Sequence, residues 1–325
     1  MRFKLTPRFK LLAVLCICLT GEELWLRNAF ASNTGRIVFT SLRDGNAEIY
    51  VMDADGGNQE NLTNHPAYDY HPDWSPDGTK IAFVSRRDGR WTQIYVMVAD
   101  GMNVMRLTDG TGQKGHPDWS PDGSKIAFSV DDREDYIAVM DADGRNRKTL
   151  EVEAKYPSWS PDGGTIAYVS FRDGLGEIYL IGVGGRGRER VTHDLEVKLN
   201  PSFSPDGRRI AYDAHPEGFG HIYAVGADGR NRVRLTHKKE HHSEAAWSPD
   251  GGIIAYNVVG GIWPGNVHST IHLMAADGRY MRQLSNNRNA IDLQPDISPL
   301  GLAVSTASNK STTWGKLKKL QPYRR

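Results

Sequence analysis

The chain has 325 residues, with 40 Lys/Arg, 39 Asp/Glu and two cysteines, Cys16 and Cys18, which lie together in an apolar N-terminal run. The rest of the chain therefore offers no disulfide and no thiolate metal site. Residues 32–309 hold 29 Lys/Arg against 37 Asp/Glu, and this excess of carboxylates argues against a nucleic-acid partner.

Residues 1–31 have the layout of a secretory signal peptide. Four basic residues come before or at the edge of the apolar run Leu11–Leu19, and Ala29-Phe30-Ala31 offers a small-residue cleavage site. The run is shorter than the ~20 residues of a membrane-spanning helix. We expect export to the periplasm or cell envelope, with no transmembrane segment in the mature chain. The alternative is an uncleaved anchor or a disordered leader.

One motif recurs along the remaining chain. Its clearest copy, Pro72–Phe83, reads Pro-Asp-Trp-Ser-Pro-Asp-Gly-Thr-Lys-Ile-Ala-Phe. The anchor residues of six copies lie 45, 40, 44, 44 and 50 residues apart: Trp74, Trp119, Trp159, Phe203, Trp247 and Ile297. Four-stranded propeller blades repeat at about 40–50 residues. The spacing predicts an all-β fold, a six-bladed β-propeller of four-stranded blades over residues 36–305.

The second copy shows the strands expected in each blade. They are Pro72–Ser75, Lys80–Val84, Gln93–Met97 and Val104–Thr108. A Ser-Pro-Asp-Gly turn joins the first two, because proline presets φ and glycine accepts a positive φ. Leu-Thr pairs such as Leu62-Thr63 are predicted to lie in fourth strands.

The series Trp-Ser-Pro-Asp-Gly…Ile-Ala-Phe, Arg-Asp-Gly…Ile-Tyr-Val-Met, Ala-Asp-Gly…Leu-Thr resembles the TolB-like β-propeller repeat over nearly the whole mature chain. The resemblance implies that strand one lines the channel, that strand four lies at the rim, and that partner peptides bind at the channel. Full TolB proteins carry a smaller α/β domain before the propeller. Only a few residues separate the cleavage site from Arg36, so we expect that domain to be absent.

The two ends of the repeat region complement each other. Residues 36–63 supply strands two, three and four, and residues 294–299 supply only a strand one. We expect them to join in a composite blade, which removes the exposed sheet edges of an open array. The anchor residues should then lie in the core.

The loops of the two disc faces differ between copies. Turns after strands one and three barely change, whereas connections after strands two and four vary in length and hold or adjoin ten of the eleven histidines, all but His272. Variable loops on a rigid scaffold usually carry binding. We therefore expect a partner on this variable face, where Trp263 in the longest loop either contacts the partner or folds over the channel.

The residue before each inner-strand proline, or its equivalent, is predicted to lie at the channel mouth. These residues are His71, His116, Tyr156, Asn200, Glu244 and Gln294. Histidine and glutamate can bind transition metals, but the spacing follows the blade period and forms no compact ligand motif. The alternatives are a metal site and a hydrated polar rim.

Other motifs favour structure over chemistry. Asp53-Ala54-Asp55-Gly56 is similar to the start of a calcium loop but lacks the closing glutamate, so a hairpin turn is expected. No Gly-x-Ser-x-Gly motif appears, and the segment after residue 305 is too short for a hydrolase domain. Residues 306–325 form a basic tail, either a solubilising end or an attachment to an acidic surface or an export-related address.

Together these features predict an exported, monomeric, non-catalytic propeller that binds a protein or peptide, with neither cofactor nor metal. The expected contacts are His71, His116, Tyr156, Asn200, Glu244 and Trp263. The alternative function is a metal-dependent propeller enzyme similar to a polysaccharide lyase, with the histidine-rich mouth as its site.

Overall fold

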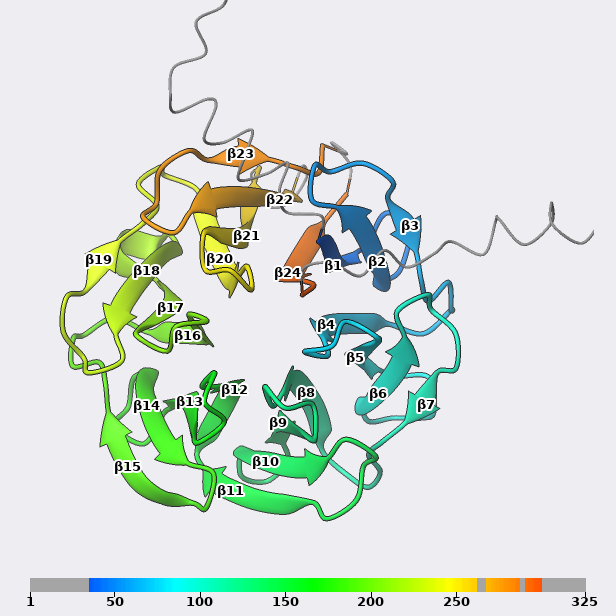
Figure 1. Ribbon diagram of the computed structural model, residues 1–325, viewed down its shortest axis with the longest axis horizontal. Coiled ribbons are helices and arrows are strands. Elements are labelled where there is room, and N and C mark those ends of the chain that lie inside the picture. The colour runs from blue at the N-terminus through cyan, green and yellow to red at the C-terminus, as the bar shows by residue number, and fades with distance from the viewer. Residues whose placement is uncertain (1–34, 262–266, 287–289, 300–325) are drawn as a thin grey trace, which may run out of the picture. The chain divides into compact units, whose positions relative to one another are not determined.

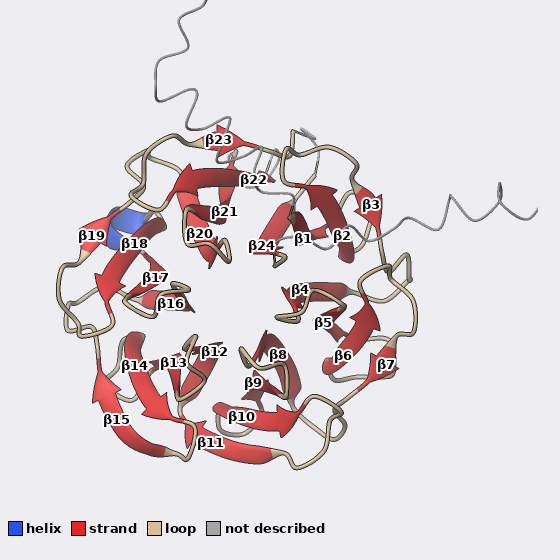
Figure 2. Ribbon diagram, in the orientation of Figure 1, coloured by secondary structure: helices blue, strands red, loops and turns tan. Residues whose placement is uncertain are grey.

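Short runs of β-branched and aromatic residues separated by Gly, Pro and Asp favour strands and turns, and strands make up nearly all the regular secondary structure of the described residues. The structure is a computed structural model that describes residues 35–261, 267–286 and 290–299. Six four-stranded antiparallel sheets surround a central channel (Figure 1). One short 3-10 turn, η1 (Pro216–Gly218), interrupts the described strands (Figure 2). No helix of the described residues is long and apolar enough to cross a membrane.

Each sheet is one blade, numbered here 1 to 6 in chain order. Blade 1 contains β24 (Asp292–Ile297), β1 (Arg36–Ser41), β2 (Glu48–Asp53) and β3 (Glu60–Asn61); blade 2 contains β4 (Asp69–Trp74), β5 (Lys80–Ser85), β6 (Gln93–Val98) and β7 (Met105–Arg106). Blade 3 contains β8 (Gln113–Trp119), β9 (Lys125–Asp131), β10 (Tyr136–Asp141) and β11 (Lys148–Val152); blade 4 contains β12 (Ala154–Trp159), β13 (Thr165–Ser170), β14 (Glu177–Gly182) and β15 (Arg186–Arg190). Blade 5 contains β16 (Lys198–Phe203), β17 (Arg209–Ala214), β18 (His221–Gly226) and β19 (Val233–Arg234); blade 6 contains β20 (His241–Trp247), β21 (Ile253–Gly260), β22 (His268–Ala275) and β23 (Arg282–Gln283).

The predicted order of strands within a blade is confirmed. β4 of blade 2 lies at the channel and β7 at the rim, and the other blades repeat this order (Figure 1). Blade 1 is composite as expected, because β24 pairs antiparallel with β1 through Thr40–Leu293 and Ser41–Asp292. The Ser41 hydroxyl also donates to Asp292 Oδ1 at 2.6 Å, which fastens the two ends of the domain together.

Two details of the strand prediction are wrong. Inner strands begin about three residues before the proline, as β4 does at Asp69. The Leu-Thr pairs follow the fourth strands and are not part of them, as Leu62-Thr63 follows β3. Their threonine accepts a backbone bond from strand three instead: Ile49 N donates to Thr63 Oγ1 at 3.0 Å. A half-buried hydroxyl therefore replaces further ladder pairing at this point.

The core lies between blades, where neighbouring sheets bury their faces on each other. One cluster joins Val38 and Leu62 of blade 1 to Trp74 and Phe83 of blade 2. Five of the six anchor residues are buried as predicted, and Phe203 is half-buried. Burial of an anchor tryptophan makes its truncation cost about 3–5 kcal/mol.

Candidate functional site

A β-bulge in each inner strand shapes the channel mouth. The inner-strand register shifts once in every blade, for example between Tyr70 and Asp73. Of the thirteen non-glycine residues with positive φ in the described chain, six lie at these bulges, with φ of 50–58°: His71, His116, Tyr156, Asn200, Glu244 and Gln294. Bulges turn side chains in new directions, and left-handed non-glycine residues are concentrated at functional sites. The six residues predicted from the repeat therefore share one unusual backbone geometry.

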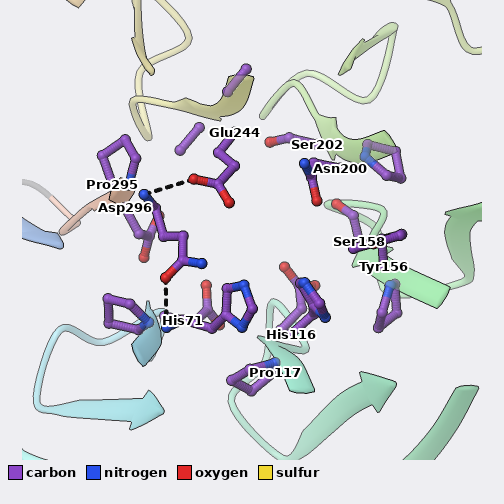
Figure 3. A pocket seen from close by; sticks show the side chains of 18 residues that line it. His71, His116, Pro117, Tyr156, Ser158, Asn200, Ser202, Glu244, Pro295 and Asp296 are labelled. Carbon is purple, nitrogen blue, oxygen red and sulfur yellow. Dashed lines mark hydrogen bonds between the residues drawn. The ribbon is translucent and has the colours of Figure 1, made fainter. Parts of the chain in front are cut away.

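The structure brings all six together around one hollow. They line a cavity of about 150 Å³ together with the residues that follow them, which are five prolines and Ala245. Figure 3 shows His71 and His116 next to each other, and Glu244 across the channel from them. The space of about five water molecules, at about 30 Å³ each, admits one projecting side chain or the tip of a peptide turn.

One half of the mouth is aromatic. The rings of His71 and His116 have centroids 3.9 Å apart, and the centroids of His116 and Tyr156 are 4.4 Å apart at an interplanar angle of 72°. The Nδ1 atoms of both histidines are buried and have no hydrogen-bond partner within the described chain. Buried polar atoms are nearly always paired, so these two nitrogens are available to a ligand.

The other half is polar and held by hydrogen bonds between blades. The backbone N–H of Gln294 donates to Glu244 Oε2 at 2.9 Å. The side-chain Oε1 of Gln294 accepts a hydrogen bond from His71 N at 3.0 Å. Asn200 Nδ2 donates to Asp213 Oδ1 at 2.9 Å. These bonds fix the polar side chains before any partner arrives.

Burial leaves the mouth with little formal charge near neutral pH. Desolvation lowers the pKa of His116 to about 3, with a smaller contribution from Lys155. Burial, and then the neighbouring His116, holds the pKa of His71 well below its usual value. Burial raises the pKa of Glu244 to about 7, and the Asp213 carboxylate adds to the rise. The mouth therefore presents neutral imidazoles and one carboxyl that titrates near neutrality.

A second layer of side chains below the mouth was missed by the sequence analysis. The Asp that follows the inner-strand proline accepts the backbone N–H of the anchor in the next blade: Asp296 from Trp74 at 2.7 Å, Asp73 from Trp119 at 2.8 Å and Asp118 from Trp159 at 2.7 Å. Burial raises the pKa of all three carboxyls. The sequence does contain a signal for this layer: only three of the six copies carry the aspartate, and those three belong to consecutive blades.

The opposite half of this layer has small residues. Ser158, Ser202 and Ala246 occupy the equivalent positions, and Ser158 Oγ accepts Phe203 N at 3.2 Å. A second hollow of about 180 Å³ opens toward the turns after strand one, and shares Asp118, Asp296 and the three small residues with the mouth cavity. The channel lining at this level thus has carboxyl groups on one side and small side chains on the other.

Other predicted features lie elsewhere. Trp263 is outside the described residues, so its role stays a prediction. Not all ten histidines near the variable loops belong to a binding surface: His221 and His242 are buried in strands of blades 5 and 6, with ring centroids 5.6 Å apart. Asp53-Ala54-Asp55-Gly56 forms the predicted hairpin, with Gly56 N donating to Asp53 O at 2.8 Å.

The arrangement does not resemble a preformed metal centre. Among the described residues, no group of three or more His, Cys, Asp or Glu side chains is placed to hold a metal ion. The two free imidazole nitrogens, the carboxyl of Glu244 and the amides can instead bind a peptide or a polar side chain by hydrogen bonds.

Comparison with known proteins agrees with this fold. The model of the TolB beta propeller domain matches residues 25–137 and 130–261. The Tol-Pal system protein TolB of Geobacter sulfurreducens is 46% identical over 48 residues, which are 15% of this chain and 11% of that protein. A protein TolB homolog of Chlorobaculum tepidum is 43% identical over 72 residues, or 22% of this chain and 15% of that protein. The matched segments thus span about a tenth to a sixth of the relatives' length.

Solved structures share the fold at lower identity. The crystal structure of TolB from Acinetobacter baumannii superposes with a TM-score of 0.70 at 23% identity, covering 86% of this chain and 71% of that one. Hydrazine synthase of Kuenenia stuttgartiensis contains a similar fold, with a TM-score of 0.68 at 16% identity over 84% of this chain and 48% of that one. Such likeness shows only the fold. The family model covers well over half of the sequence, and this chain therefore belongs to the TolB β-propeller domain family.

Proposed function

We propose that this protein is an exported, non-catalytic propeller that captures a protein partner by taking a peptide segment of it into the channel mouth. The carrying observation is the ring of six bulged residues around the 150 Å³ cavity, in which two buried imidazole nitrogens have no hydrogen-bond partner among the described residues. A rigid, largely uncharged hollow of this size suits a neutral side chain or a peptide turn better than a folded surface.

The relatives' names supply the context of this proposal. Two of the sequence relatives are called a Tol-Pal system protein TolB and a protein TolB homolog. We place this chain in the periplasm or cell envelope, with residues 1–31 removed as a signal peptide, residues 36–305 as the propeller and residues 306–325 as a basic tail. N-terminal sequencing of mature protein from the native host should begin at Ser32; a start at Met1 on cytoplasmic material would contradict export.

The capture test compares two sets of variants in a pull-down from envelope extract. His116→Ala, Glu244→Ala and Trp263→Ala should each weaken capture strongly, because interface energy concentrates in a few central anchors worth about 2 kcal/mol or more. Their melting temperatures should stay close to that of the parent. Mutation of His116 and Glu244 tests the mouth itself, and mutation of Trp263 tests the loop beside it.

The matched controls lie in the turns on the opposite face. Asp77 and Asp122 accept hydrogen bonds from Ser75 and Ser120, each at 2.6 Å, within their own turns. Asp77→Ala and Asp122→Ala should lower the melting temperature and spare capture. Full capture by the mouth variants, or loss of capture only in the turn variants, would place the binding site elsewhere.

A further inference from the structure

The junction between blades 3 and 4 is built differently from the others. The anchors Trp119 and Trp159 are only 40 residues apart, the shortest interval in the chain. A single residue, Glu153 with φ 53°, connects β11 to β12. The usual Leu-Thr segment with its loop is therefore missing between these two blades.

A size change in the neighbouring hairpin accompanies the short connection. After strand three, the other five hairpins place a small alanine against the preceding blade: Ala54, Ala99, Ala142, Ala227 and Ala276. Blade 4 has Val183 at this position, and 39% of Val183 is exposed. The Leu150 side chain that it faces is half-buried, as is Leu107 in the same role, whereas Leu62, Leu235 and Leu284 are buried.

The separation of the backbones shows the effect. A Cβ added to the hairpin glycine of the other five blades would lie 2.6–2.8 Å from a carbonyl oxygen of the preceding blade. At Gly185 of blade 4 the nearest such oxygen, that of Leu150, is 3.6 Å away. The hairpin β14–β15 thus stands back from β11 by about an ångström.

The space between them is a hollow of about 330 Å³, called here the junction hollow. Its wall is apolar, from Val139, Met140, Leu150, Trp159 and Val183, and its polar rim comes from Asn146, Lys125, Lys148, Asp122 and Asp162. At about 30 Å³ for each non-hydrogen atom, a value taken from liquid water, it holds roughly ten such atoms. An apolar cavity with a few polar groups at its edge is typical of a small-molecule site.

The rim gives the site a preferred charge. The ammonium of Lys125 already forms an ion pair, because its Nζ lies 2.7 Å from Asp141 Oδ1. Asp122 and Asp162 are turned toward their own turns, where each accepts bonds from a serine hydroxyl and a backbone N–H. The ammonium of Lys148 has no carboxylate within 4.0 Å in the described part of the chain.

Lys148 is also oriented toward the hollow. It is the cross-strand partner of Val139, and such partners share one face of a sheet. Its aliphatic stem can cover the apolar wall while the ammonium stays in water at the rim. An anionic head group beside Lys148 and an apolar body against Leu150 and Trp159 would satisfy both parts of the site.

We propose that the junction hollow binds a small apolar carboxylate of about ten non-hydrogen atoms, such as a medium-chain fatty acid. The carboxylate pairs with Lys148, and the chain lies against Val139, Leu150, Trp159 and Val183. This site is separate from the channel mouth, so its test leaves the partner-capture proposal untouched.

The test uses three probes of equal chain length, octanoate, octan-1-ol and octylammonium, titrated into the full mature chain. Methyl NMR spectra should show shifts at Leu150, Val139 and Val183 on addition of octanoate. Octanoate should bind more tightly than octan-1-ol, and octylammonium least tightly. Absence of octanoate binding, or equal binding of octylammonium, would overturn the proposal.

Two variants locate the site. Lys148→Gln should weaken the binding of octanoate about twofold to fivefold, the range expected for one exposed ion pair. It should leave the binding of octan-1-ol unchanged. Val139→Phe should fill the hollow and abolish binding of both, whereas the control Val233→Phe on β19 should not. Thermal melts establish that each variant is folded. Unchanged octanoate binding in a folded Val139→Phe variant, or in Lys148→Gln, would overturn the assignment.

Discussion

Glu244 shows how burial decides the chemistry of a single residue. Its carboxyl lies beside Gln294 N and the Asp213 carboxylate, and its pKa is raised from 4.5 to about 7. The protonated form is therefore favoured in the folded protein. The contribution of Glu244 to the free energy of unfolding is fully present below pH 4.5 and is lost as the pH rises through about 7.

Glu244→Gln should remove this pH dependence, because an amide keeps the shape without the charge. We expect the variant to unfold like the parent at pH 4.5 but to be more stable at pH 8, by at most about 3 kcal/mol. Urea denaturation at the two pH values measures the difference. An equal effect at both pH values would mean that folding does not raise the pKa of Glu244.

The buried histidines of blades 5 and 6 titrate in the opposite sense. Burial, with a contribution from Arg234, lowers the pKa of His221 to about 4, and Arg234 Nη2 lies 2.7 Å from His221 Nε2. Burial also lowers the pKa of His242. The unfolded chain binds protons first, so stability is lost as the pH falls from about 6.5 toward 4.

His242→Phe should therefore protect the protein from acid. The ring of His242 packs between His221 and Tyr256, with centroids 5.6 and 5.9 Å away, and phenylalanine fits a similar space without a titrating group. Charged neighbours Arg234, Lys238 and Glu240 remain in the variant, as do His237 and His241. Thermal melts between pH 4 and 7 should show a shallower loss than in the parent. An unchanged pH profile would exclude His242 as a source of acid sensitivity.

At the scale of the element, a threonine follows the fourth strand in blades 1, 2, 4 and 5 and ends the blade. In blade 4, Thr192 Oγ1 accepts Ile178 N at 2.9 Å and donates to the Glu177 carboxylate. Glu177 in turn pairs with Arg190 Nη2 at 2.9 Å. One hydroxyl thus satisfies a buried backbone donor and orients a buried carboxylate.

Thr192→Val should leave both groups without this partner and destabilise the protein by about 1–3 kcal/mol. Thr192→Ser keeps the hydroxyl and is the matched control, with a smaller loss. Equilibrium urea unfolding of the two variants gives the comparison. Equal losses would mean that methyl packing, and not the hydrogen bonds, carries the stability.

The repeat predicted the elements better than their local geometry. Turn residues and apolar alternation located the first three strands of each blade, because those signals are local. The bulge at His71 and its equivalents could not be predicted, since a histidine before proline shows no preference for a positive φ. Burial of His221 and His242 depends on packing between blades, so their type alone suggested a surface role.

For the whole molecule, blade period and complementary ends were sufficient to predict six blades and their closure. The six mouth residues were found for the same reason, because equivalent positions in a closed ring must converge. The acidic second layer was missed because its aspartates bond the next blade, a contact that no single repeat contains. The junction hollow required coordinates, although the 40-residue interval marked its position.

Truncation tests the closure directly. Deleting residues 294–325 removes most of β24, including Asp296, whose carboxylate accepts Trp74 N, and should unfold or aggregate the domain. Deleting residues 310–325 should leave the melting temperature unchanged. If the variant that lacks residues 294–325 melts like the parent, β1 does not need β24 for stability.

The composite blade also sets the order in which the chain can be completed. β1 is made early, but its inner partner β24 ends at Ile297, near the end of the sequence. During synthesis, and during any passage of the chain through a pore from its N-terminus, β1 keeps an open edge until the last strand emerges. The propeller therefore cannot close before β24 pairs with β1, and until then the chain stays open enough to pass through a pore.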